Sequence, residues 1–238
     1  MSHICAASPS MSAPHPEPIK RTRRRSLADQ AEFRQTILKL ANAIFAAEGY
    51  DALSMRRLAN EAGVPPMTLY RYFPSKYHLL RHIWDDLLVE AAASANAASA
   101  NASEPTTVLT TWLGGFTDYW LNHRDHYLLV FTTGHEGSRE SLGLAPYLEA
   151  SPGKIVLEHL GSLLDACLPT TGSAGALSVE ARRALGEWLM CRLFGLLHPV
   201  LYLPTFPWRS PALLRDEMLA EVAEKISAVT GRCPPAAT

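Results

Sequence analysis

The side chains whose types and spacing could do chemistry concentrate in one short stretch, EAGVPPMTLYRYFPSK, which spans residues 61–76. Two prolines follow a glycine, and hydroxyl, aromatic and basic side chains then surround a leucine and a phenylalanine. Hydroxyl groups and the cations of arginine and lysine bind phosphate oxygens, and side chains at the start of a helix can reach base edges. The stretch therefore favours noncovalent recognition of nucleic acid over bond-breaking chemistry. Its candidate contact residues are Pro66, Met67, Thr68, Tyr70, Arg71, Tyr72 and Lys76.

Charge is distributed unevenly along the 238 residues, although the whole chain carries only −1. Residues 1–81 hold 12 Lys and Arg against 6 Asp and Glu, a balance of +6. Residues 82–238 hold 10 against 17, a balance of −7. Such asymmetry indicates a polyanionic partner for the basic part of the chain.

A run of cations stands just before the first predicted helix, and its members are Lys20, Arg21, Arg23, Arg24 and Arg25. A flexible basic arm can follow phosphates or enter the minor groove of DNA, and Arg24 and Arg25 are its candidate contacts. Runs of this kind are also common in solvated tails, so the sequence leaves both interpretations open. The Ser- and Pro-rich residues 1–25 are expected to form a disordered leader.

The sequence contains no pattern typical of an enzyme or a metal site. The four cysteines lack CxxC or Cys/His ligand spacing, and no HExxH, GxSxG or phosphate-loop pattern occurs. Cys167 and Cys191 lie in apolar helical runs, where a small buried thiol is the usual role. We therefore expect no catalysis, no metal and no cofactor. The most apolar run, 188–203, is interrupted by polar residues and a proline, so we expect no membrane span and a location in the reducing cytoplasm.

The elements that must position the contact residues are predicted to be helices. Apolar periodicity indicates helices at 29–48 and 55–62, followed by a very short helix at 66–73. Ser54 fits the N-cap of the second helix, and Gly63 fits the turn that ends it. The three helices would follow one another with almost no intervening chain.

The short helix needs neighbours to hold it, and two of its residues suit that purpose. Leu69 and Phe73 are four residues apart and would anchor it, which leaves Met67, Thr68 and the tyrosines facing outward or sideways. Two helices joined by a glycine-containing turn form a helix-turn-helix. In that motif the second helix presents its N-terminal residues to base edges in the major groove.

The remainder of the chain is also predicted to be helical, so the expected fold class is all-α. A fourth helix begins after a predicted N-cap at Ser75 and continues towards an Ala-, Ser- and Asn-rich segment, 91–103, which reads as a fraying end or a linker. Ser178 and Ser210 are the predicted N-caps of the last two helices. The further helices are predicted at 105–121, 124–135, 144–150, 153–168, 178–202 and 211–230.

Residues 49–80, GYDALSMRRLANEAGVPPMTLYRYFPSKYHLL, resemble the DNA-binding domain of TetR-type transcriptional regulators, whose pattern is roughly AGVS-x-x-TLYxYFxSKxxLL. The likeness covers about residues 30–90. It implies a homodimeric repressor with an N-terminal three-helix helix-turn-helix domain, joined by a long helix to a C-terminal helical domain for ligand binding and dimerisation. The expected domains are 26–74 for DNA binding and 75–231 for regulation and dimerisation, between the leader at 1–25 and a tail at 232–238.

The resemblance also implies roles for single residues. Ser54 and Arg56 would contact the DNA, Met67 and Thr68 would lie at or near base edges, and Tyr70 and Lys76 would hold phosphates. The chain departs from the family pattern at Pro65, which stands where a serine N-cap is frequent and which offers no side-chain acceptor. The last two helices of each subunit are implied to form a four-helix dimer interface.

Aromatic side chains are concentrated on the two successive helices predicted at 105–121 and 124–135. Ligand sites are usually apolar and aromatic-lined, with a few polar groups that fix orientation. Core packing explains any single one of these side chains equally well. As a set they form the predicted lining of a ligand site, whose members are Trp112, Phe116, Tyr119, Trp120, His123, Tyr127 and Phe131.

Together these features predict a repressor that binds double-stranded operator DNA as a homodimer and is released by a small apolar or aromatic effector. An architectural DNA-binding protein without a ligand is the main alternative, and an enzyme is the weakest one. An architectural protein would not need the long apolar C-terminal half, so that half favours the regulator.

Overall fold

The computed structural model describes residues 27–132, 152–169 and 176–231, and their regular structure is helical, with no strand among them. This confirms the predicted all-α fold. The predicted arm with Arg24 and Arg25, the predicted helix at 144–150 and the predicted tail lie outside the described residues. The helices are α1 (Leu27–Glu48), α2 (Met55–Glu61), α3 (Pro66–Tyr70), α4 (Lys76–Ser99), α5 (Pro105–Asn122), α6 (Arg124–Thr132), α8 (Pro152–Cys167), α9 (Val179–Tyr202) and α10 (Pro211–Thr230).

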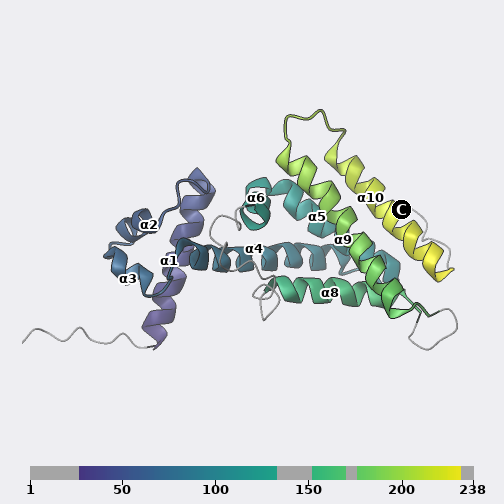
Figure 1. Cartoon of the computed structure of the whole chain (residues 1–238), viewed down its shortest axis with the longest axis horizontal. Coiled ribbons are helices and arrows are strands. Elements are labelled where there is room, and N and C mark those ends of the chain that lie inside the picture. The colour runs from purple at the N-terminus through teal and green to yellow at the C-terminus, as the bar shows by residue number, and fades with distance from the viewer. Residues whose placement is uncertain (1–26, 133–151, 170–175, 232–238) are drawn as a thin grey trace, which may run out of the picture.

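The helices form two groups joined by α4 (Figure 1). Helices α1, α2 and α3 gather at one end of α4, and α2 packs on both α1 and α3. Further along, α4 packs against α5, α6 and α8, while α10 packs on α5 and α9. Helix α4 therefore contacts both groups of helices.

Serine side chains fix the starts of three helices as the sequence predicts. The hydroxyls of Ser54, Ser75 and Ser178 accept hydrogen bonds from the backbone N–H groups three residues later. The prediction for Ser210 is wrong in part: it occupies the N-cap position of α10, but its side chain makes no capping hydrogen bond. Pro211 follows at the first helical position, where one of the unpaired N–H groups is simply missing.

The predicted fourth helix runs into the Ala-, Ser- and Asn-rich segment 91–103, so residues 91–99 are helical rather than a fraying end or a linker. The segment continues α4 to Ser99, and its Ala91 and Ala95 side chains are fully buried. Alanine has the highest helix propensity and the smallest side chain that still favours a helix, so the segment can bring α4 close to α5. Trp112 Nε1 on α5 donates a hydrogen bond of 2.8 Å to Asn96 Oδ1 across this contact.

The two cysteines on described helices differ in exposure. Cys167 is buried and its Sγ lies 3.3 Å from the carbonyl oxygen of Leu163, as expected for a small buried thiol. Cys191 is exposed, which overturns the prediction of a buried thiol, because it lies on the face of α9 turned away from the core. Over the described ranges, no helix is long and apolar enough to cross a membrane, and no group of His, Cys, Asp and Glu is arranged to hold a metal ion.

Candidate nucleic-acid interface

The turn between α2 and α3 is set by a glycine with a left-handed backbone. Gly63 has a φ of +65°, a conformation that side chains other than glycine rarely adopt. Pro65 then occupies the N-cap position of α3 without a side-chain hydrogen bond, and Pro66 begins the helix. The chain thus turns within four residues and restarts as a helix.

Helix α3 is shorter than predicted, because it ends at Tyr70 rather than Phe73. The backbone N–H groups of Tyr72 and Phe73 still bond to the carbonyl oxygen of Leu69, so residues 71–73 continue as a tight turn. Pro74 disfavours the helical conformation at Phe73 and so prevents the helix from continuing beyond this turn.

The side chains of this segment divide into anchors and outward-facing groups. Leu69 and Phe73 are each 0% exposed, as predicted for anchors. Met67 is 73% exposed and Tyr70 is 43% exposed, while Arg71 is exposed and Thr68 is half-buried. A short helix held by two buried side chains therefore displays its leading edge to solvent.

Tyr72 differs from the other predicted contacts, because its ring packs within the three-helix group. The centroid of its ring lies 4.7 Å from that of Phe33 on α1, and the side chain is half-buried. The ring therefore stabilises α3 against α1. Contact of the exposed part of the Tyr72 side chain with DNA stays a prediction.

Two successive arginines at the start of α2 have different surroundings. Arg57 donates hydrogen bonds to the carboxylates of Glu48, at 2.5 and 2.7 Å, and of Glu61, at 2.8 Å. The bond from Arg57 holds the pKa of the Glu48 carboxyl below its ordinary value. Arg56 is exposed and makes no ion pair with any residue in the described part of the chain. Of the two cations, Arg56 is the one available to a phosphate.

Lys76 is held in place at the start of α4. Its Nζ lies 3.7 Å from the centroid of the Tyr50 ring and donates to the Tyr50 carbonyl oxygen at 3.3 Å. Contact of Lys76 with a phosphate stays a prediction. The side chain of Ser75 caps the same helix end by accepting from the backbone N–H of His78.

Histidines on α4 and α6 lie where the first helix meets the remaining group. His82 Nε2 is 3.3 Å from Arg34 Nη1 on α1, and the ring of His126 on α6 lies 6.1 Å from that of Phe45 on α1. Burial is the largest cause that holds the pKa of each histidine below its ordinary value. Helix α1 is thus contacted from both α4 and α6, through histidines whose burial disfavours the charged form.

The predicted ligand lining forms one continuous aromatic cluster on α5 and α6. Rings stack or meet edge to face at centroid distances of 5.2 Å for Trp112 and Phe116, 5.8 Å for Phe116 and Trp120, and 5.8 Å for Trp120 and Tyr127. Most of these side chains are buried, whereas Phe131 is half-buried and His123 is exposed, stacked on Tyr119. The arrangement suits a well-packed core as well as a ligand lining.

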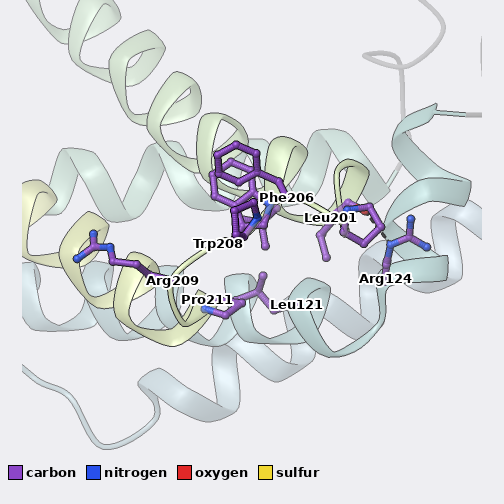
Figure 2. Close-up of a pocket in the computed structure, with 10 residues that line it drawn as sticks. Leu121, Arg124, Leu201, Phe206, Trp208, Arg209 and Pro211 are labelled. Carbon is purple, nitrogen blue, oxygen red and sulfur yellow. Dashed lines mark hydrogen bonds between the residues drawn. The ribbon is translucent and has the colours of Figure 1, made fainter.

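A cavity of about 370 Å³ lies beside this cluster (Figure 2), between the end of α5, the start of α6 and the segment that joins α9 to α10. None of the predicted lining residues contributes to its wall. The aromatic walls come from Phe206 and Trp208, which lie between the helices predicted at 178–202 and 211–230. Aromatic residues set between prolines, FPW, were the signal that could have singled out this loop.

Comparison with known proteins identifies the helix-turn-helix region. Residues 37–83 match the family described as bacterial regulatory proteins, tetR family. Over 51 residues the chain is 53% identical to the HTH-type transcriptional repressor KstR of Mycobacterium tuberculosis, which covers 21% of this chain and 23% of that repressor. Over 75 residues it is 40% identical to the uncharacterized HTH-type transcriptional regulator Rv0767c of the same species, with coverages of 32% and 33%. The chain therefore matches a quarter to a third of the length of these curated relatives.

Solved structures share the fold over most of the chain. Mycobacterium smegmatis BioQ superposes with a TM-score of 0.55 at 20% identity, over 82% of this chain and 98% of that one. Thermus thermophilus FadR, a TetR-family repressor in complex with lauroyl-CoA, does so with a TM-score of 0.55 at 19% identity, over 86% and 99%. At these identities the likeness concerns the fold alone. Residues 37–83 are therefore similar to the tetR family of bacterial regulatory proteins, and the described helices share the fold of these solved structures.

Proposed function

We propose that the protein represses transcription by binding operator DNA as a homodimer, and that a small apolar or aromatic effector releases it. DNA binding is supported by the exposure of α3, where the Met67 side chain is 73% exposed while Leu69 is fully buried. A reading helix needs only three or four side chains to reach the bases, so a five-residue helix suffices when it is rigidly held. Fluorescence anisotropy with operator fragments selected from random DNA tests this binding directly.

Substitutions of the two neighbouring arginines on α2 separate phosphate contact from structural pairing. Arg56→Ala should weaken binding to all DNA sequences and lower the slope of log affinity against log salt by about one, since one phosphate contact is lost. Arg57→Ala should leave that slope nearly unchanged, because Arg57 is already paired with Glu48 and Glu61. The measurement is anisotropy over a salt series. Equal slopes for wild type and Arg56→Ala would contradict the proposed orientation of α2 on DNA.

Dimerisation is proposed through α9 and α10. Apolar residues of these two helices, such as Leu193 and Val222, are buried within the chain itself. Large apolar side chains nevertheless remain exposed here, with Tyr202 at 56% and Leu213 at 54%. A second subunit matters because two reading helices must meet half-sites about one helical turn, ~34–36 Å, apart.

A charge placed on the exposed surface of α10 tests the dimer. Leu213→Arg should convert the sedimenting species from two chains to one at micromolar concentration, since a buried unpaired charge at an interface is strongly unfavourable. The matched control is Leu157→Arg on α8, where the leucine is 43% exposed and lies outside the proposed interface. Wild-type protein that sediments as a single chain would refute the homodimer.

Release by an effector follows from the position of α4. A ligand bound among the C-terminal helices that displaces α4 would move α1, because Arg34 and His82 join these helices. By linkage, such a ligand binds the DNA-free form more tightly by the same factor by which it weakens DNA binding. One effector affinity with and without operator would refute this regulation.

A further inference from the structure

Three buried polar groups on α5 and α6 have no hydrogen-bond partner among the described residues. They are Thr117 Oγ1, Trp120 Nε1 and Tyr127 OH, and each of these residues is 0% exposed. Buried polar groups in folded proteins are almost always paired, because an unpaired one has lost its hydrogen bonds to water without replacement. Three in one region point to a partner that binds there.

The three groups belong to one part of the fold. Thr117 and Trp120 are three residues apart on α5, so they are neighbours on the helix surface. The ring of Tyr127 on α6 meets that of Trp120 edge to face at 5.8 Å, and both rings contact Phe131. Two rings with polar atoms lie beside them: that of Tyr119, whose centroid is 5.0 Å from that of Trp120, and that of His198 on α9, 6.2 Å from that of Tyr127.

The cavity in Figure 2 lies next to this region. Leu121, in its wall, directly follows Trp120 and is one helical turn beyond Thr117. Arg124, at one end of the cavity, is three residues before Tyr127 on α6. None of the three residues lines the cavity wall, so a molecule in the cavity would have to displace the half-buried Leu121 side chain before it reached the unpaired groups.

We propose that Thr117, Trp120 and Tyr127 provide the polar contacts of a buried site for an uncharged, mainly apolar ligand that carries a hydrogen-bond-accepting oxygen such as a ketone carbonyl. The inference rests on the proposed function, in which the C-terminal helices hold an effector. It assigns the chemical class of that effector and the residues that select it.

The hydrogen-bonding chemistry of the three groups determines the chemical class of the ligand. An indole N–H can only donate, and the two hydroxyls can also donate, so an acceptor satisfies the set while a pure donor leaves Trp120 unpaired. Burial raises the pKa of Tyr127 to about 12, which shows that its surroundings disfavour charge. A carboxylate would meet the same penalty there, because no lysine or arginine in the described part of the chain stacks on the rings of Trp120 or Tyr127. A neutral carbonyl oxygen avoids it.

Calorimetry with three matched probes tests the site on the full-length protein. Benzophenone has the acceptor oxygen, diphenylmethane has nearly the same shape without it, and 4-benzoylbenzoate adds a charge. We expect benzophenone to bind about tenfold more tightly than either of the others.

Variants of the protein test which residues select the ligand. Tyr127→Phe and Trp120→Phe should each reduce the preference for benzophenone over diphenylmethane severalfold. Tyr77→Phe on α4, away from the cluster, should leave that preference intact. Equal affinities for ketone and hydrocarbon, or no binding of benzophenone at its solubility limit, would overturn the proposal.

A second measurement needs no ligand. If the hydroxyls are unpaired in the free protein, Tyr127→Phe and Thr117→Val should each raise Tm by about 2–4 °C, because a desolvated polar group is removed. Tyr77→Phe should leave Tm unchanged. An unchanged or lowered Tm for both cluster variants would show that the groups are already satisfied, and would also overturn the proposal. Operator binding of the same samples is measured separately, so a failure of the ligand site is distinguishable from a failure of DNA binding.

Discussion

Leu69→Ala is expected to abolish operator binding while the C-terminal helices remain folded. Leu69 is fully buried, and its backbone carbonyl also accepts from Tyr72 and Phe73, so the residue holds the short helix and the turn that follows it. Truncation of a buried leucine costs about 2–5 kcal/mol, which is a large share of the stability of a small three-helix unit. A five-residue helix has no stability of its own to offset that loss.

The measurement combines anisotropy with hydrogen exchange resolved by segment. In Leu69→Ala, amides of α2 and α3 should exchange much faster, whereas those of α5 and α9 should change little. Met67→Ala is the control, since Met67 lies two residues earlier and is 73% exposed. It should shift stability by no more than about 0.5 kcal/mol and yet change which operator is preferred. Normal operator affinity in Leu69→Ala would show that α3 does not carry recognition.

The parts of the interface that follow from local rules could be predicted from the sequence. The cap at Ser54, the glycine turn at Gly63 and the anchors Leu69 and Phe73 each depend on a few neighbouring residues. The difference between Arg56 and Arg57 could not be predicted in this way. It depends on Glu48, nine residues earlier at the end of α1, which the fold brings against Arg57.

The helices of the C-terminal half could be predicted from the sequence, whereas the position of its cavity could not. The aromatic residues of α5 and α6 stood out by composition, but composition does not distinguish a lining from a core. The cavity lies instead at the segment joining α9 to α10, where the wall residue Leu201 accepts a 2.7 Å hydrogen bond from Arg124 Nε. That bond joins residues 77 positions apart, so only the tertiary structure reveals it.

The contact between α4 and α5 shows why the alanine-rich segment misled sequence reasoning. Low hydrophobicity and small side chains resemble a linker when the partner helix is unknown. In the fold they permit the close approach of Gly115 on α5, where an added Cβ would lie 2.6 Å from Ala98 Cβ and 3.0 Å from Ala95 Cα. The small residues on α4 and the glycine on α5 therefore form one close helix contact.

Gly115→Ala should consequently destabilise the protein, although alanine is normally the better helix residue. Both opposing atoms belong to backbone or to a side chain without rotamers, so α4 and α5 must separate to admit the methyl group, at a cost of about 1–3 kcal/mol. The matched control is Gly161→Ala on α8, where an added Cβ meets nothing within 4 Å. There the substitution should stabilise by about 0.5–1 kcal/mol.

Urea unfolding followed by circular dichroism measures the change in stability of both variants. The midpoint should fall for Gly115→Ala and rise for Gly161→Ala, with little change in the slope of either transition. A rise for Gly115→Ala would mean that α4 and α5 are not in close contact in solution. Since α4 also contacts α1, that result would remove one route by which a ligand bound among the C-terminal helices could move the first three helices. The α4–α5 contact is therefore the element of the fold on which the proposed regulation most directly depends.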